Sequence, residues 1–370
     1  MQLRCTRVAL LAVAGLLVAA DSLRAESPLG SLKSGTVELK SAGPLAFGPE
    51  GILFVGDPQA AAIHAIDTGD NKPANSADRP KVSAINEKIG ALLGIEGKAI
   101  RIADMAVNPI SGNTYLSVAR GAGPEAAAVI VRVDRSGKPS QFELKGVRCA
   151  TTTLPNAIEG KSRQEAITQM GYAKGTLYVA GLSNEEFASK LRAIPFPFKG
   201  ADKGTSIEIY HGSHAKLEGK NTDRQTASPI RTFVAYESNG ELNLLAAYTC
   251  TPLVRIPVSS LKPGEKVKGT TIAELGNRNR PLDMIVYTKG GKDYILMANS
   301  SRGVMKIPAE GIDKVEGIKE AKVPDKAGVG YETIASLKGV EQLDRFDKEH
   351  AVLLVRAEGG ALNLETIELP

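Results

Sequence analysis

The chain has 370 residues, with 46 Lys and Arg against 41 Asp and Glu, and a formal net charge of +5 at neutral pH. This charge is small for the length, and no dense run of Lys or Arg contains interleaved aromatic residues, so we expect no nucleic-acid partner. After the N-terminal segment, no apolar run reaches the length that crosses a bilayer, so we expect no membrane span.

Residues 1–25 have the features of a secretory signal peptide. A basic start, MQLRCTR, precedes the apolar run VALLAVAGLLVAA, and small residues follow it. The run is too short to span a membrane. We therefore expect export to the periplasm or the extracellular space, with residues 26–370 forming a single, monomeric domain.

Two cysteines, Cys149 and Cys250, remain after removal of such a signal peptide. An even number of cysteines in an oxidising compartment is typical of a disulfide. The alternative is two buried thiols that lie far apart. We predict a Cys149–Cys250 disulfide.

One hairpin pattern recurs along the chain, with starts roughly 50–65 residues apart. Its clearest copies are IADMAVNPISGNTYLSVARG at 102–121 and PLDMIVYTKGGKDYILMANSSRG at 281–303. A fainter copy, ITQMGYAKGTLYVAG, covers 167–181, and related hairpins begin near residues 44, 230 and 342. Each hairpin is followed by a third apolar strand and usually by a fourth, which is typical of the blade of a β-propeller.

We therefore predict an all-β, six-bladed β-propeller. Seven blades stay open, because residues 199–228 have room for a further hairpin. The sixth unit stops after its third strand at Pro370, and a lone strand, SGTVELK at 34–40, precedes the first hairpin. We expect this N-terminal strand to close the last blade, since closure leaves no unpaired end.

Aligning the hairpins predicts a polar ring at the channel mouth. Asp104, Gln169, Asp283 and Asp344 occupy equivalent places near the start of their inner strands. Oxygen-rich sets of this kind hold hard divalent cations such as calcium, so these four residues are the candidate metal ligands. The alternative is structural, with each carboxylate accepting hydrogen bonds from backbone amides of the neighbouring blade.

The return of the second strand, together with the approach to the fifth hairpin, predicts further polar groups on the same rim. Arginines and amides gathered there can hold a carboxylate or a phosphate in forked geometry. The alternative is that these side chains satisfy backbone groups of their own loops. The candidate ligand-binding residues are Arg120, Arg280, Asn299 and Arg302.

The segments GPLAFGPEGILFVGD at 43–57 and RPLDMIVYTKGGKDYILMANSSRGVMKI at 280–307 resemble the blades of NHL-repeat and SMP-30/gluconolactonase-like propellers. The resemblance implies six blades and, in the SMP-30-like branch, a central divalent metal held by a Glu and by Asn and Asp residues. The family's Glu has no match here, so the resemblance favours an NHL-type binding surface over lactonase activity. The residues that fall where such ligands lie are Asp57, Asp104, Asp283 and Asn299.

The sequence therefore predicts an exported β-propeller that binds a small molecule or a protein partner at the channel rim. A metal-dependent hydrolase or lactonase that uses the rim carboxylates is the alternative. A third interpretation, an accessory subunit of an exported redox enzyme, follows from the compartment alone. No phosphate-binding loop, dinucleotide fingerprint or nucleophile elbow occurs, so whether the protein is an enzyme stays open.

Overall fold

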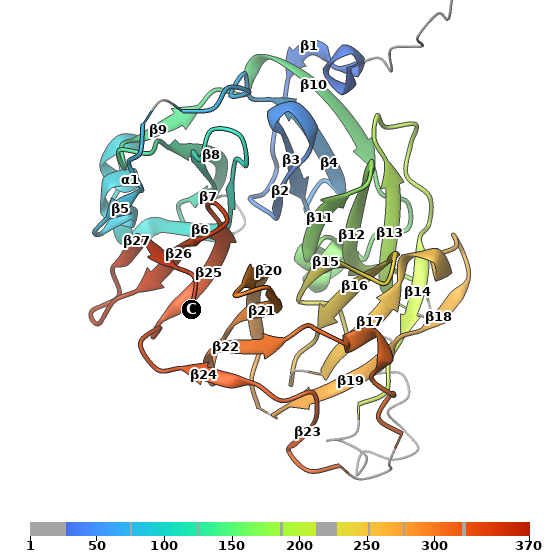
Figure 1. Cartoon of the computed structure of the whole chain (residues 1–370). Helices are drawn as coiled ribbons and strands as arrows, with labels where there is room; N and C mark the ends of the chain where they lie inside the picture. Colours follow the sequence, from blue (N-terminus) through green and yellow to red (C-terminus); the bar gives the residue numbers. More distant parts are fainter. Residues whose placement is uncertain are drawn as a thin grey trace, which may run out of the picture.

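A computed structural model describes residues 27–370 except 75, 124–125, 186–187, 212–227, 251, 277 and 320–322. Six β-sheets surround a central channel, which confirms the predicted six-bladed propeller (Figure 1). The described residues contain no seventh sheet and one α-helix, α1 (Ile85–Leu93). No helix in these ranges has the length and apolar character that a membrane crossing requires. The predicted signal peptide lies outside the described residues.

Each blade starts with an inner strand at the channel and adds antiparallel strands outward. Blade 1 contains β2 (Leu45–Phe47), β3 (Ile52–Asp57), β4 (Ala62–Asp67), β10 (Lys145–Thr153) and β1 (Lys33–Thr36). Blade 2 contains β6 (Ile100–Val107), β7 (Thr114–Arg120), β8 (Ala127–Val133) and β9 (Pro139–Phe142). Blade 3 contains β11 (Gln169–Ala173), β12 (Thr176–Leu182), β13 (Ser189–Pro195), β14 (Thr205–Glu208) and a parallel edge strand, β18 (Lys266–Lys268).

The other three blades follow the same plan. Blade 4 contains β15 (Thr232–Ser238), β16 (Glu241–Ala247), β17 (Pro252–Pro257), β19 (Thr270–Leu275) and β23 (Lys326–Gly328). Blade 5 contains β20 (Pro281–Lys289), β21 (Lys292–Asn299), β22 (Gly303–Pro308) and β24 (Glu332–Ile334). Blade 6 contains β25 (Val340–Arg345), β26 (His350–Arg356), β27 (Leu362–Glu368) and β5 (Lys81–Val82).

The blades do not follow one another around the axis in chain order. Contacts between inner strands run β2, β6, β25, β20, β15, β11 and back to β2, so blade 2 lies between blades 1 and 6 (Figure 1). After β4 the chain crosses to the outer edge of blade 6 as β5, builds blade 2, and returns to blade 1 as β10. Blade 2 is therefore inserted between the third and fourth strands of blade 1.

The predicted closure of the last blade by the strand at 34–40 is wrong. β1 pairs instead with β10 in blade 1, and β5 supplies the outer strand of blade 6. The physical reason is that β1 is too close to blade 1 along the chain to reach blade 6. Only a short connection separates β1 from the inner strand β2, and blade 2 stands between blade 1 and blade 6.

Both faces of the middle strands are buried, because each blade packs against two neighbours. In β3, Phe54 points into the seam with blade 3, whereas Leu53 and Val55 point into the seam with blade 2. Successive side chains of a strand point to opposite faces, so a strand buried on both faces appears as a continuous apolar run. Six such clusters, one at each seam, form the core.

The predicted disulfide is also wrong, since Cys149 and Cys250 are not bonded to each other. Cys149 lies in β10 of blade 1, and Cys250 lies in the turn after β16 of blade 4. Blade 3 lies between these two blades. The two cysteines occupy similar places in the hairpin pattern, but this does not bring their sulfur atoms together, because they belong to blades that do not touch.

The chain that crosses from blade 1 toward blade 6 is anchored by Asp70. Its Oδ2 accepts hydrogen bonds from Ser111 Oγ (2.7 Å), Asn113 Nδ2 (3.0 Å) and Tyr115 OH (3.2 Å), all in the first hairpin of blade 2. Its backbone carbonyl accepts a further bond from Asn108 Nδ2 (2.7 Å). Burial raises the pKa of Tyr115, whose ring is fully buried, so this hydroxyl stays a donor.

We expect Asp70→Ala to lower the free energy of unfolding by about 2–4 kcal/mol, because it leaves the buried Tyr115 hydroxyl and two other donors without their acceptor. Urea denaturation measures the change. The control is Asp78→Ala in the same connection, where only the Asp78 backbone bonds with other residues. This control should change stability by less than about 0.5 kcal/mol. Equal effects would contradict the anchoring role.

Candidate functional site

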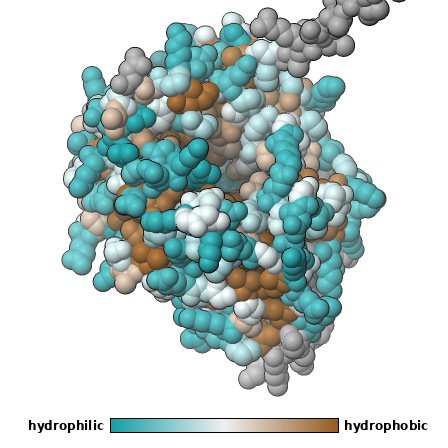
Figure 2. Space-filling model, viewed as in Figure 1, coloured by the Kyte–Doolittle hydropathy of each residue, from teal (hydrophilic) through white to brown (hydrophobic). Residues whose placement is uncertain are grey.

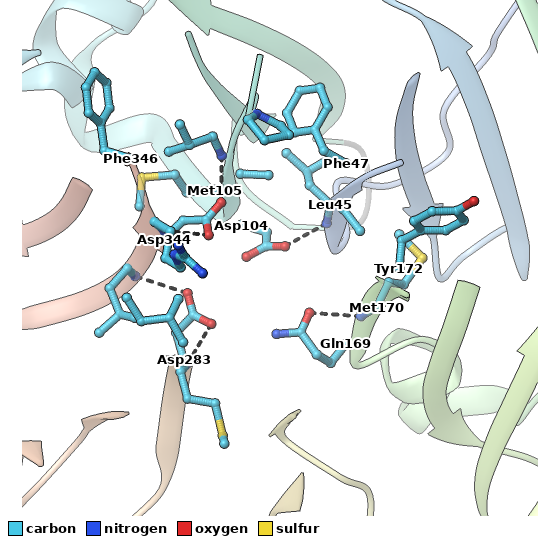
Figure 3. Close-up of a pocket in the computed structure, with 18 of the residues that line it drawn as sticks. Leu45, Phe47, Asp104, Met105, Gln169, Met170, Tyr172, Asp283, Asp344 and Phe346 are labelled. Carbon is cyan, nitrogen blue, oxygen red and sulfur yellow. Dashed lines mark hydrogen bonds between the residues drawn. The ribbon is translucent and has the colours of Figure 1, made fainter. Parts of the chain in front are cut away.

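A cavity of about 610 Å³ occupies the propeller axis and is lined by residues of all six inner strands. The four residues predicted from the hairpin alignment, Asp104, Gln169, Asp283 and Asp344, all line it (Figure 3). Asp283 is buried, whereas Asp104 and Asp344 keep partial exposure. The structure therefore brings these four side chains together, as their equivalent places in the repeat suggested.

Each of the three carboxylates joins its own blade to the next one. One oxygen of the Asp accepts a hydrogen bond from a backbone N–H on the inner strand of the neighbouring blade. We call these three contacts the seam bonds. They run from Leu45 N to Asp104 Oδ2 (2.6 Å), from Val107 N to Asp344 Oδ2 (2.7 Å), and from Leu343 N to Asp283 Oδ2 (3.0 Å).

The second carboxylate oxygen accepts the backbone N–H of the residue that follows the Asp. Met284 N lies 2.8 Å from Asp283 Oδ1, and Arg345 N lies 2.7 Å from Asp344 Oδ1. Asp104 receives the same kind of bond from the backbone of Met105. Each carboxylate therefore accepts two backbone N–H groups, which is the structural alternative raised by the sequence.

Gln169 connects blades 3 and 4 in a related way. Its Oε1 accepts the backbone N–H of Met170 (2.9 Å), and its Nε2 donates to Thr232 Oγ1 of β15 (3.3 Å). A neutral amide can donate as well as accept, so here the cross-blade partner is a hydroxyl oxygen and not a backbone N–H.

Local backbone irregularities aim these side chains at the seams. The pairing register shifts by one residue between Ile102 and Asp104 in β6, and between Pro281 and Asp283 in β20. A bulge of this kind bends the strand and redirects the next side chain. The bulges direct Asp104 and Asp283 across their seams, whereas Asp344 reaches across from a regularly paired part of β25.

Burial is the main cause that raises the pKa of all three carboxyl groups. It raises the pKa of Asp104 to about 7 and that of Asp344 to about 6. The hydrogen bonds from backbone N–H groups lower both pKa values and so offset part of this effect. The pKa of Asp283 is raised further by the negative charges of Asp104 and Asp344. The cavity thus gathers carboxylates that repel one another.

The geometry does not favour the predicted calcium site. In the part of the chain that the structure describes, no group of three or more His, Cys, Asp or Glu residues is placed to hold a metal ion. Asp57, which the family resemblance offered as a ligand, is fully buried at the end of β3. Its carboxylate accepts bonds from Lys40 N (2.6 Å), Ser41 Oγ (2.8 Å) and Ala60 N (3.1 Å).

The second predicted set, Arg120, Arg280, Asn299 and Arg302, does not line the cavity. The cavity extends instead toward the hairpin turns at the far ends of the inner strands, where Phe346 and Lys348 line it. Asn299 Oδ1 accepts the backbone N–H of Ser301 and of Arg302 (both 3.0 Å), so this amide holds its own turn. The Arg302 guanidinium pairs with Asp325 (3.2 Å).

Sequence reasoning missed the apolar part of the cavity. The signal was present in the Asp-Met pairs of the repeat, which place Met105 and Met284 beside two of the carboxylates. Methionines and aromatic residues line this part of the cavity, so its wall consists of thioether groups and rings. These residues are Phe47, Met105, Met170, Tyr172, Phe233, Met284 and Phe346.

No protein-family model matches this chain, and a search of curated proteins finds no match. Similar solved structures include the PQQ-bound aldose sugar dehydrogenase of Streptomyces coelicolor, at 14% identity and a TM-score of 0.35, covering 91% of this chain and 96% of that one. Virginiamycin B lyase of Staphylococcus aureus has 10% identity and a TM-score of 0.39, covering 91% and 100%. Drosophila semaphorin 1b has 11% identity and a TM-score of 0.34, covering 92% and 88%. Likenesses this low identify no function, and the propeller is established by the strand pairing itself.

We expect stability to fall as pH rises from about 4 to about 7. Unfolded Asp loses its proton near pH 3.9, whereas the folded carboxyls keep theirs to about pH 6–7, so the folded state binds more protons in this window. Unfolding free energy from urea titrations should be on the order of 4 kcal/mol higher at pH 5 than at pH 8. Asp104→Asn should flatten this dependence. A profile that instead rises across this window would contradict the raised pKa values.

Proposed function

We propose that this protein is an exported, non-catalytic binding propeller whose central cavity holds a small molecule with an apolar body and a positively charged end. The observation that carries the proposal is the composition of the cavity wall. Three mutually repelling carboxyl groups line one part, and methionines and aromatic rings line the rest. Export is supported by the signal-peptide pattern of residues 1–25.

The size and the wall both suit a small ligand. The cavity of about 610 Å³ is within the range of small-molecule sites, which combine a mostly apolar lining with a few polar groups. A cation near Asp104 and Asp283 would offset their repulsion, and the faces of rings such as Tyr172 attract positive charge. Arg345, Asp347 and Lys348 also line the cavity, and Arg345 partly offsets the charge of Asp344, so Asp104 and Asp283 are the carboxylates that favour a cation most.

Binding is favoured over hydrolysis because the carboxylate oxygens already accept backbone N–H bonds, and because no histidine among the described residues lines the cavity. A protein partner has less support. Among the described residues only Leu92 is a large hydrophobic side chain with high exposure, at 43%. Figure 2 shows hydrophilic residues over most of the visible face, with small hydrophobic patches between them.

The absence of Trp from the sequence allows a selective optical test. In Tyr172→Trp the single indole lies in the cavity wall, so ligand entry should change its emission. The probes are aryl-alkyl ammonium ions, compared with aryl-alkyl carboxylates of the same size. We expect the ammonium ions to bind at least about ten-fold more tightly, a difference of about 1.4 kcal/mol.

The matched control is Tyr294→Trp in β21, a residue outside the cavity wall. Its emission should not respond to either series. Tighter binding of the carboxylates, an equal response of the two variants, or no response to any ammonium ion would each contradict the proposal.

A further inference from the structure

Two arginines, Arg231 and Arg280, lie at the entry to two inner strands, outside the wall of the central cavity. These residues immediately precede β15 and β20, the inner strands of adjacent blades. Neighbouring inner strands start at the same end of the channel, so both arginines belong to one rim. Neither residue lines the central cavity.

Short contacts connect the two arginines through the loops between them. Arg231 Nε donates to Thr249 Oγ1 (3.2 Å), and the next residue, Cys250, donates its backbone N–H to Asn279 O (2.8 Å). Arg280 follows Asn279, and its own backbone is held by Ser300 through two bonds of 2.9 Å. Both residues are thus positioned by neighbouring loops.

One carboxylate, Glu165, pairs with Arg231 and lies near enough to Arg280 to act on its charge. Glu165 Oε1 accepts a hydrogen bond from Arg231 Nη1 (2.8 Å), and the Glu165 charge also acts on Arg280. Partial burial and the positive charge of Arg231 lower the pKa of Arg280, which shows that the two cations are close enough to repel. The Arg280 side chain makes no hydrogen bond to the described residues, so its donors remain available.

We infer that Arg231 and Arg280 form a binding site for an anionic group, a carboxylate or a phosphate, on this rim. A planar guanidinium presents paired N–H donors that match the oxygens of both groups. One acid beside two arginines leaves a local excess of positive charge, and an anion would relieve the repulsion between them. The site is separate from the proposed central site, because neither arginine lines the cavity that would hold the central ligand.

Titration of the full chain with inorganic phosphate and with succinate tests the inference, with NaCl adjusted to keep the ionic strength constant. Isothermal titration calorimetry should show saturable binding of at least one of the two anions. Arg280→Gln should raise its Kd at least ten-fold. The control, Arg120→Gln, removes an exposed arginine at the end of β7 in blade 2 and should change the Kd by less than two-fold.

Glu165→Gln should change the Kd in the opposite direction. It removes the carboxylate that competes for Arg231, so it should lower the Kd by several-fold while the fold is preserved. Circular dichroism verifies the fold of each variant. Absence of saturable binding, equal losses in Arg280→Gln and Arg120→Gln, or weaker binding by Glu165→Gln would each overturn the inference. Failure here would leave the Tyr172→Trp emission response unchanged, so the two proposals are distinguishable.

Discussion

The propeller depends on hydrogen bonds that cross the seams between blades at the channel. An inner strand has one edge without a partner strand, and its backbone N–H groups need acceptors. Six such edges converge on a narrow axis, where they cannot pair with one another. Asp104, Asp283 and Asp344 supply carboxylate oxygens to the N–H groups of Leu45, Leu343 and Val107 on the next blade. Three seams are held in this way, and Gln169 reaches across a fourth.

The same contacts give the channel its chemical character. Holding three carboxyl groups near one axis raises their pKa values through desolvation and, for Asp283, through repulsion by its neighbours. The groups are fixed in place by the backbone, so a ligand would meet a preorganised wall. A charged set that stabilises the ring by hydrogen bonding therefore also creates a place that favours positive charge.

The sequence predicted the parts of the fold that local patterns determine. The hairpin repeat predicted six blades, and its alignment predicted the four polar residues that line the cavity, because equivalent positions in blades around one axis meet there. The insertion of blade 2 into blade 1 could not be predicted. The insertion depends on the blades to whose outer edges β10 and the two-residue strand β5 add. The sequence does not reveal this choice, because the edge strands of different blades have similar residue patterns. The roles of Asn299 and Arg302 were missed for a similar reason, since the loop geometry decides whether a side chain faces a ligand or its own turn.

Amide hydrogen exchange tests the central claim most directly. The N–H groups of Leu45, Val107 and Leu343 lie at the channel edge of their strands, yet each donates to an Asp of the adjacent blade. The account predicts strong protection of all three amides in the wild-type protein, and selective loss of protection at Leu45 in Asp104→Ala. Rapid exchange at these amides in the wild type, or unchanged protection of Leu45 in the variant, would contradict the claim that the carboxylates join the blades.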